Sequence, residues 1–355
     1  NSFTLSGGDV AITGGTGADT VAFGTSYTTS DTFDGGAGAD IMSVTWSSGN
    51  NTPTGISNVE TLASTFTGGS LNATNLSSVT THRIVDQTAN TSITNLASTA
   101  TTINQRGDGT TARANTFSYA TDAAATVTYN NSSASEALTN ASTTFSNVSN
   151  LTIAANDGSS TNSFAWDLGS LAGGTALGTL TLTTGSDVED TLSTGDITAA
   201  NLETWTITAD DANLTVGAYA SAGELKTLTI NNTNTASLGD ITVGAIGATS
   251  AADELTAFSV TTVGTSDAAG ATVVDMATLD AAGATFTFTM NLDGNYGASD
   301  IDTVTATSVS DIDIDTGTLG TSLTVDNFDV SGDVGDVDIN VGDGFEGADA
   351  FIDAA

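Results

Sequence analysis

The sequence of 355 residues contains no cysteine, one proline and one histidine. Without cysteine, the chain can form neither disulfides nor thiolate metal sites, and it has no cysteine nucleophile. A Ser-His-Asp triad would depend on His82, which lies in Thr80-Thr81-His82-Arg83 with no nucleophile motif beside it. We therefore expect His82 to be a surface or turn residue, and we expect the protein not to be an enzyme.

Basic side chains are also scarce, because four Lys and Arg oppose 41 Asp and Glu and leave a formal net charge of −37. Such a chain has no basic patch with which to displace the counterions of a nucleic acid, and an anionic membrane surface would repel it. Most carboxylates lack a salt-bridge partner, so the folded state should depend on bound cations or on high ionic strength. No apolar run is long enough to span a bilayer, so we expect no membrane insertion.

The composition nevertheless favours a folded chain over a disordered one. Charged residues make up only 13% of the sequence and hydrophobic residues 38%. Short runs in which Thr, Ala, Val, Ile and Leu alternate with polar residues are typical of β-strands. The chain begins at Asn1 rather than at Met, which suggests a processed or partial piece of a longer precursor.

Two segments near the N-terminus, 14–22 and 35–43, match the nonapeptide Gly-Gly-x-Gly-x-Asp-x-apolar-x. Glycine lets the backbone turn tightly and point its carbonyl oxygens inward, and Asp adds a hard, charged oxygen. Calcium binds about six to eight such oxygens in irregular geometry, so the pattern predicts Ca²⁺-binding turns. The predicted calcium-binding residues are Asp19, Asp40, Asp34, Gly14, Gly17, Gly35, Gly38, Asp9, Asp31 and Asp349.

These turns resemble the RTX repeat family, and in particular the large bacterial surface-layer proteins that carry scattered RTX turns. The resemblance rests on residues 31–42, followed by 55–62, and covers about 60 of the 355 residues. The glycine pairs at Gly14 and Gly35 are 21 residues apart (35 − 14 = 21), so they do not form the usual nine-residue array. The resemblance implies a secreted, calcium-stabilised protein at a cell surface that assembles with copies of itself.

From about residue 146 onward the pattern apolar-x-x-apolar-x-apolar recurs, with a period of roughly 23 to 30 residues. A single copy cannot bury its apolar face alone, whereas stacked copies build a continuous core. We therefore predict an all-β parallel β-solenoid with RTX-type calcium turns at its N-terminal end. A string of β-sandwich domains is the alternative, because the spacing of the turns suits such domains too.

We expect three segments along the chain: a calcium-binding β-roll at 1–70, an irregular Thr/Asn-rich β region at 71–145, and the solenoid at 146–355. Weak helical patterns occur at 163–171 and 251–257. Asp311, Asp313 and Asp315 alternate along one predicted strand and so should lie on one face, which is either solvated or bridged by a cation.

The sequence thus predicts a structural extracellular protein that assembles into a surface layer or filament. One alternative is an adhesin or a carbohydrate-binding stalk domain, with cell-surface polysaccharide as its partner. Another is a polysaccharide-active enzyme that uses paired carboxylates. Trp46, Trp166 and Trp205 would be candidates for a sugar platform, although Trp205 occupies an apolar position of the repeat and is expected in the core.

Overall fold

The computed structural model describes residues 2–5, 7–106, 111–129, 138–155, 165–185, 191–210, 212–233, 240–263, 274–292, 298–315 and 322–340. Every regular element within these ranges is a β-strand, which confirms the all-β class. The predicted helical pieces are wrong: the described part of the first forms β15 (Ala165–Asp167) and the start of β16 (Ser170–Gly174), and the second is a loop ahead of β26 (Ala257–Thr262). Within the described ranges, no helix could cross a membrane.

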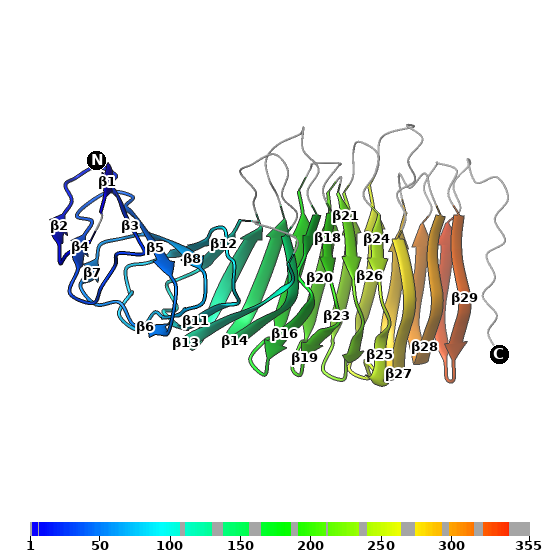
Figure 1. The fold of residues 1–355 in the computed structure, drawn as a ribbon. Helices are drawn as coiled ribbons and strands as arrows, with labels where there is room; N and C mark the ends of the chain where they lie inside the picture. The colour runs from blue at the N-terminus through cyan, green and yellow to red at the C-terminus, as the bar shows by residue number, and fades with distance from the viewer. Residues whose placement is uncertain are drawn as a thin grey trace.

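The strands stack into a parallel β-solenoid that advances from the N-terminal end of an elongated body to its C-terminal end (Figure 1). In one run of rungs, β17 (Thr179–Thr184) pairs with β20 (Thr204–Ala209), which pairs with β23 (Thr227–Asn232) and then with β26. These pairings are parallel and join stretches one repeat apart. They confirm the predicted solenoid over the sandwich alternative, whose strands would pair antiparallel.

The largest run of paired strands, which we call sheet I, extends along most of the described chain. Its short members are β3 (Thr20–Gly24), β5 (Ile41–Trp46), β8 (Thr61–Phe66), β10 (Thr81–Ile84), β12 (Thr102–Gln105), β17, β20, β23, β26 and β30 (Val334–Asn340). It also includes the C-terminal parts of the long strands β13 (Arg113–Tyr129), β14 (Leu138–Ala155), β27 (Val274–Asn291) and β28 (Ala298–Asp315).

Two further runs of strands complete the coils. Sheet II contains β6 (Asn50–Asn51), β9 (Ser70–Asn72), β11 (Thr91–Leu96), β16, β19 (Ile197–Ala199), β22 (Tyr219–Ser221), β25 (Ile246–Ser250) and part of β29 (Ser322–Val330). Sheet III contains β15, β18 (Thr191–Thr194), β21 (Asn213–Val216) and β24 (Ile241–Val243). At the N-terminal end, β1 (Ser2–Thr4) pairs with β3, and β2 (Ala11–Thr13), β4 (Thr32–Asp34) and β7 (Ile56–Ser57) form a separate small sheet.

The core consists of columns of apolar side chains that run from rung to rung. Leu180, Trp205, Leu228, Phe258 and Phe288 occupy successive register positions in sheet I and are all buried. Successive side chains of a strand point to opposite faces, so the alternating sequence sends these residues inward and their polar neighbours outward. The predicted core position of Trp205 is confirmed.

Candidate metal centre

The two nonapeptide turns stack directly on each other. The strands before them pair with Ala11 opposite Thr32, and the strands after them pair with Thr20 opposite Ile41, so the 21-residue offset is kept on both sides (32 − 11 and 41 − 20). Between these strands, the Gly14 N–H donates to the Asp34 carbonyl over 2.6 Å. The spacing that departs from a nine-residue array is therefore the length of one full coil here.

Several glycines in these turns are required by close packing. A Cβ atom on Gly14 would overlap the Gly35 carbonyl oxygen, and one on Gly35 would overlap the Asn58 carbonyl oxygen. Gly38 has a φ of +143°, which L side chains rarely adopt, and its missing Cβ would lie 2.8 Å from the Gly17 carbonyl carbon. The turns can therefore approach each other only because these positions have no side chain.

Three carboxylates form a ladder beside the stacked turns. The Gly15 N–H donates to Asp19 Oδ2 over 2.8 Å, the Asp19 N–H to Asp40 Oδ1 over 2.7 Å, and the Asp40 N–H to Glu60 Oε2 over 2.8 Å. Asp19 and Asp40 are buried, with exposed fractions of 2% and 0%. Asp40 and Glu60 thus each accept a hydrogen bond from the backbone N–H of the Asp one coil earlier, and these bonds fix the register of the rungs.

Asp40 Oδ2 is the unusual atom of this ladder. It is buried and accepts no hydrogen bond from the described part of the chain. A buried carboxylate oxygen without a donor is costly, since the charge has lost its hydration and gained no replacement. A cation bound at this atom would supply the missing interaction.

Glu60 was not among the residues predicted from the sequence. The turn before it, Ser57-Asn58-Val59, lacks the glycine signature and is shorter than the two nonapeptide turns. No sequence spacing marks Glu60; the structure does, because Thr61 pairs with Ile41 and Leu62 pairs with Met42. That alignment places Glu60 one rung above Asp40.

The donor set suits a hard cation such as calcium. Carboxylate and backbone carbonyl oxygens are the ligands that calcium prefers. Within the described ranges, no group of three or more His, Cys, Asp or Glu side chains could hold a metal ion by itself. A calcium ion beside Asp19 and Asp40 would therefore take much of its coordination from the carbonyls of the glycine turns.

Two other predicted ligands, Asp34 and Asp31, are already hydrogen-bonded within the protein. Asp34 Oδ1 accepts the Gly36 N–H over 3.1 Å and the Asn58 side-chain amide over 2.8 Å. Asp31 is buried, and its two oxygens accept the Val10 N–H over 2.9 Å and the Thr28 N–H over 2.6 Å. Burial alone would raise the pKa of Asp31, but hydrogen bonds from Thr28 and Val10 lower it below its usual value.

The remaining predicted residues lie apart from the ladder or outside the described chain. Gly17 lies in the first turn and is exposed, and Asp9 is exposed ahead of β2. Asp349 is not among the described residues. The ladder therefore brings together Asp19 and Asp40 from the prediction and adds Glu60.

The prediction that His82 is a surface or turn residue is wrong. His82 lies in β10 with 1% of its surface exposed, between Leu62 of β8 and Ile103 of β12. The strand alternates Thr81 out, His82 in and Arg83 out, so the imidazole takes the place of a core side chain. Burial lowers the pKa of His82 to about 4, and its Nδ1 atom has no hydrogen-bond partner within the described chain.

The alternating acidic residues near the C-terminus lie on the outer face of sheet I, as predicted. Asp311 is opposite Asp336 and Asp313 is opposite Asp338 on adjacent rungs, and all four side chains are exposed. Neighbouring strands are about 4.8 Å apart, so these carboxylates repel each other unless solvent or cations screen them.

A related group surrounds Asp300 on β28. Burial raises the pKa of this carboxyl, and the negative charges of Asp326, Asp302 and Asp275 raise it further. Asp275 and Asp300 occupy paired positions on adjacent rungs. Carboxylates of neighbouring coils thus repel one another here, and a nearby cation would relieve that repulsion.

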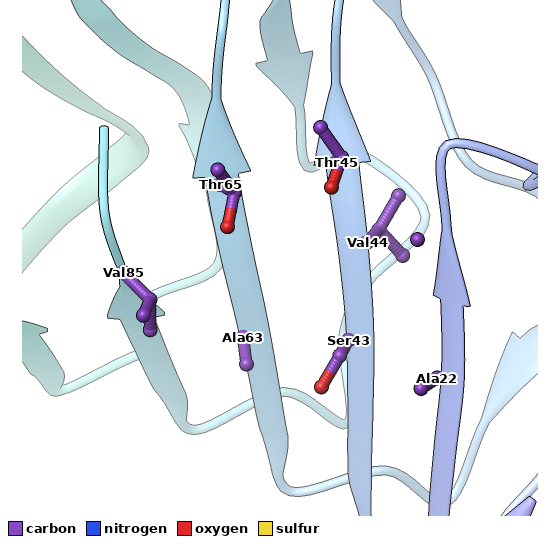
Figure 2. Close-up of a pocket in the computed structure, with 8 residues that line it drawn as sticks. Ala22, Ser43, Val44, Thr45, Ala63, Thr65 and Val85 are labelled. Atoms are coloured by element: carbon purple, nitrogen blue, oxygen red, sulfur yellow. The ribbon is translucent and has the colours of Figure 1, made fainter. Parts of the chain in front are cut away.

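A shallow depression of about 190 Å³ lies on sheet I between β3, β5 and β8 (Figure 2). Small side chains of neighbouring rungs line it, among them Ala22, Ser43 and Ala63. The lining contains no acid, base or aromatic ring. Trp46, Trp166 and Trp205 are buried elsewhere, so they provide no platform for a sugar.

Comparison of the chain with protein-family models, with curated proteins and with solved structures found no match. The interpretation of the stacked turns therefore depends on the residues and contacts described above.

Proposed function

We propose that this protein is a structural extracellular protein of the surface-layer type, held rigid by calcium and assembled from copies of itself on a bacterial envelope. The observation that carries the proposal is the stacked pair of nonapeptide turns with the buried Asp19–Asp40 ladder. Within the described chain Asp40 Oδ2 accepts no hydrogen bond, and the carbonyl oxygens of Gly35 and Asn58 lie at the close contacts of the stacked turns, where they are suitable calcium ligands.

The charge distribution supports a wider role for divalent cations. The exposed carboxylates of Asp311, Asp313, Asp336 and Asp338 repeat from rung to rung, and the chain as a whole carries a net charge of −37. Two such surfaces repel each other in solution, whereas divalent cations between them would join one copy to the next. The proposed assembly is therefore calcium-dependent at two levels, within the N-terminal turns and between molecules.

The alternatives have less support in the described residues. A carbohydrate-binding stalk would use exposed aromatic side chains, whereas all three tryptophans are buried. A polysaccharide-active enzyme would use an acid and a base in a cleft, and the depression on sheet I contains neither. Neither alternative explains the stacked glycine turns.

The proposal is tested by removing calcium from the intact protein. With calcium, we expect ordered sheets or filaments by electron microscopy and large particles by light scattering; with EGTA, we expect dispersal into monomers and weaker β-sheet circular dichroism. Re-addition of calcium, but not of an equal ionic strength of sodium, should restore assembly. Assembly and stability that are unchanged in EGTA would refute the proposed function.

A further inference from the structure

The outer face of sheet I carries a regular array of threonines. Strand register places one central outward position on each rung, and these positions form a column across the sheet. From Thr61 in β8 to Thr289 in β27, every rung has threonine at this position except β26, which has Ser259. The side chain of Ser259 donates a hydrogen bond to the Thr229 hydroxyl on the previous rung over 3.3 Å.

The array is two-dimensional in the middle of the sheet. The outward residues of β17 and β20 both read Thr-x-Thr-x-Thr, and those of β23 and β27 read Thr-x-Thr-x-Asn. In β26 the three positions hold Ala257, Ser259 and Thr261. Most outward side chains on these strands are half-buried by their neighbours and the residues between them are buried, so the face presents methyls and hydroxyls level with one another.

This face carries no charge, although the protein is strongly acidic. From β12 to β27, the outward positions of these three columns hold only Thr, Ser, Asn and Ala. Charged residues lie around it: Arg83 in β10 and Asp311 in β28 at the two ends of the columns, and the ion pair of Glu203 and Lys226 directly before β20 and β23. A neutral region on a chain with a net charge of −37 is matched to an uncharged partner.

The spacing of the array narrows the choice of that partner. Neighbouring strands are about 4.8 Å apart and alternate residues of one strand are about 6.7 Å apart, so the face from β14 to β27 spans about 24 Å by 13 Å. A sugar chain repeats along one direction only. A second copy of this protein would bring a like net charge, and the three columns of this face hold no carboxylate that could bind a divalent cation to offset the repulsion. Crystalline water repeats in two directions at similar intervals, accepts and donates hydrogen bonds, and is neutral.

We propose that the threonine face of sheet I, made by the outward residues of β14, β17, β20, β23, β26 and β27, binds ice. Threonine hydroxyls would hydrogen-bond to lattice waters, and the adjoining methyl groups would hold the waters between them in ordered positions. The stacked coils keep the columns in register, so the waters meet a preformed array and little ordering free energy is lost on binding. This inference is independent of the proposed calcium and assembly functions.

The test measures binding of the calcium-loaded full chain to ice. Fluorescently labelled protein is offered to a growing ice hemisphere, and thermal hysteresis and inhibition of recrystallisation are recorded on the same preparation. We expect the protein to enter the ice and to slow recrystallisation. Exclusion from the ice with no hysteresis would overturn the proposal, as would neutral-glycan binding or self-association through this face in place of ice binding.

Variants assign the activity to the face. Thr206→Tyr combined with Thr229→Tyr puts two bulky rings in the central column, and we expect a roughly tenfold or larger loss of ice affinity. Thr215→Tyr is the matched control, because Thr215 is an exposed threonine of β21 in sheet III. If the double variant loses its β-sheet signal, Thr206→Val is tested in its place. This substitution keeps the shape of the side chain and removes one hydroxyl. Equal ice binding by the face variant and the control would refute the assignment.

Discussion

Replacing Asp40 by Asn should change the free energy of unfolding in opposite directions in the absence and in the presence of calcium. Replacement by Asn leaves Oδ1 in place to accept the Asp19 N–H and converts the unpartnered Oδ2 into an amide. Without calcium, the substitution removes one of three stacked acidic groups. Two unit charges on adjacent rungs, about 5 Å apart, repel by about 3 kcal/mol at an effective dielectric of 20. Asp40 has such a neighbour on each side, Asp19 and Glu60, so in EGTA Asp40→Asn should be at least as stable as the parent, by up to about 6 kcal/mol.

With calcium, the same substitution should be destabilising, because it removes an anionic ligand. Calcium at a hundredfold excess over its Kd would stabilise the folded state by about 2.7 kcal/mol, and Asp40→Asn should lose most of this stabilisation. The assay is urea unfolding in excess calcium and in EGTA, with hydrogen exchange of the β3 and β5 amides to report on the local rungs. Asp122→Asn is the control, because Asp122 is an exposed acid of β13.

The two conditions separate the roles of Asp40. If Asp40→Asn destabilises the rungs equally in calcium and in EGTA, the carboxylate of Asp40 acts only through its interactions within the protein and the calcium interpretation fails. The control should change the free energy of unfolding by less than about 0.5 kcal/mol in both conditions, as is usual for surface substitutions.

Three other perturbations test the packing directly. The pKa of His82 is about 4 in the folded chain and 6.5 in the unfolded chain, so the unfolded state binds more protons between these pH values. The free energy of unfolding should therefore fall by about 3 kcal/mol as the pH drops from 6.5 to 4. Urea titrations of His82→Leu should lack this pH dependence. Gly35→Ala should destabilise the N-terminal rungs and weaken calcium affinity in calorimetry, whereas Gly15→Ala, which meets open space, should change both far less. Trp205→Ala should cost about 3–5 kcal/mol by urea unfolding, because the indole is fully buried; a loss below about 1 kcal/mol would contradict the stacked core.

The solenoid was predictable because its core obeys a simple rule. Each rung needs inward apolar residues at alternate positions, and copies such as 177–182, 202–207 and 225–230 show them directly. Their register confirms the prediction, since Leu180, Trp205 and Leu228 stack. The buried position of His82 was missed because residues 80–83 contain no apolar side chain, and the two apolar residues that follow, Ile84 and Val85, are adjacent and so do not show which face of the strand is buried.

The threonine array and Glu60 could not be found from spacing alone, because the turns between rungs vary in length. From Thr61 to Thr81 the central column advances by 20 residues, and from Thr229 to Ser259 by 30. A fixed period therefore fails, while hydrogen bonding still sets each strand opposite the last. Only the pairing shows that residues at such uneven intervals share one column, and the same pairing places Glu60 above Asp40.

The placement of charge along sheet I connects the two proposals. Parallel stacking puts the same position of every coil in one column, so a charge repeated at that position meets its own copy about 4.8 Å away. Across β12 to β27 the three columns avoid this repulsion by using neutral Thr, Ser, Asn and Ala. At Asp311 and Asp336, and in the ladder of Asp19 and Asp40, the columns are acidic instead. Carboxylates in register gain nothing from stacking unless a cation lies between them. The acidic columns are therefore where calcium can stabilise the fold, and the neutral columns are where a rigid, uncharged lattice can bind.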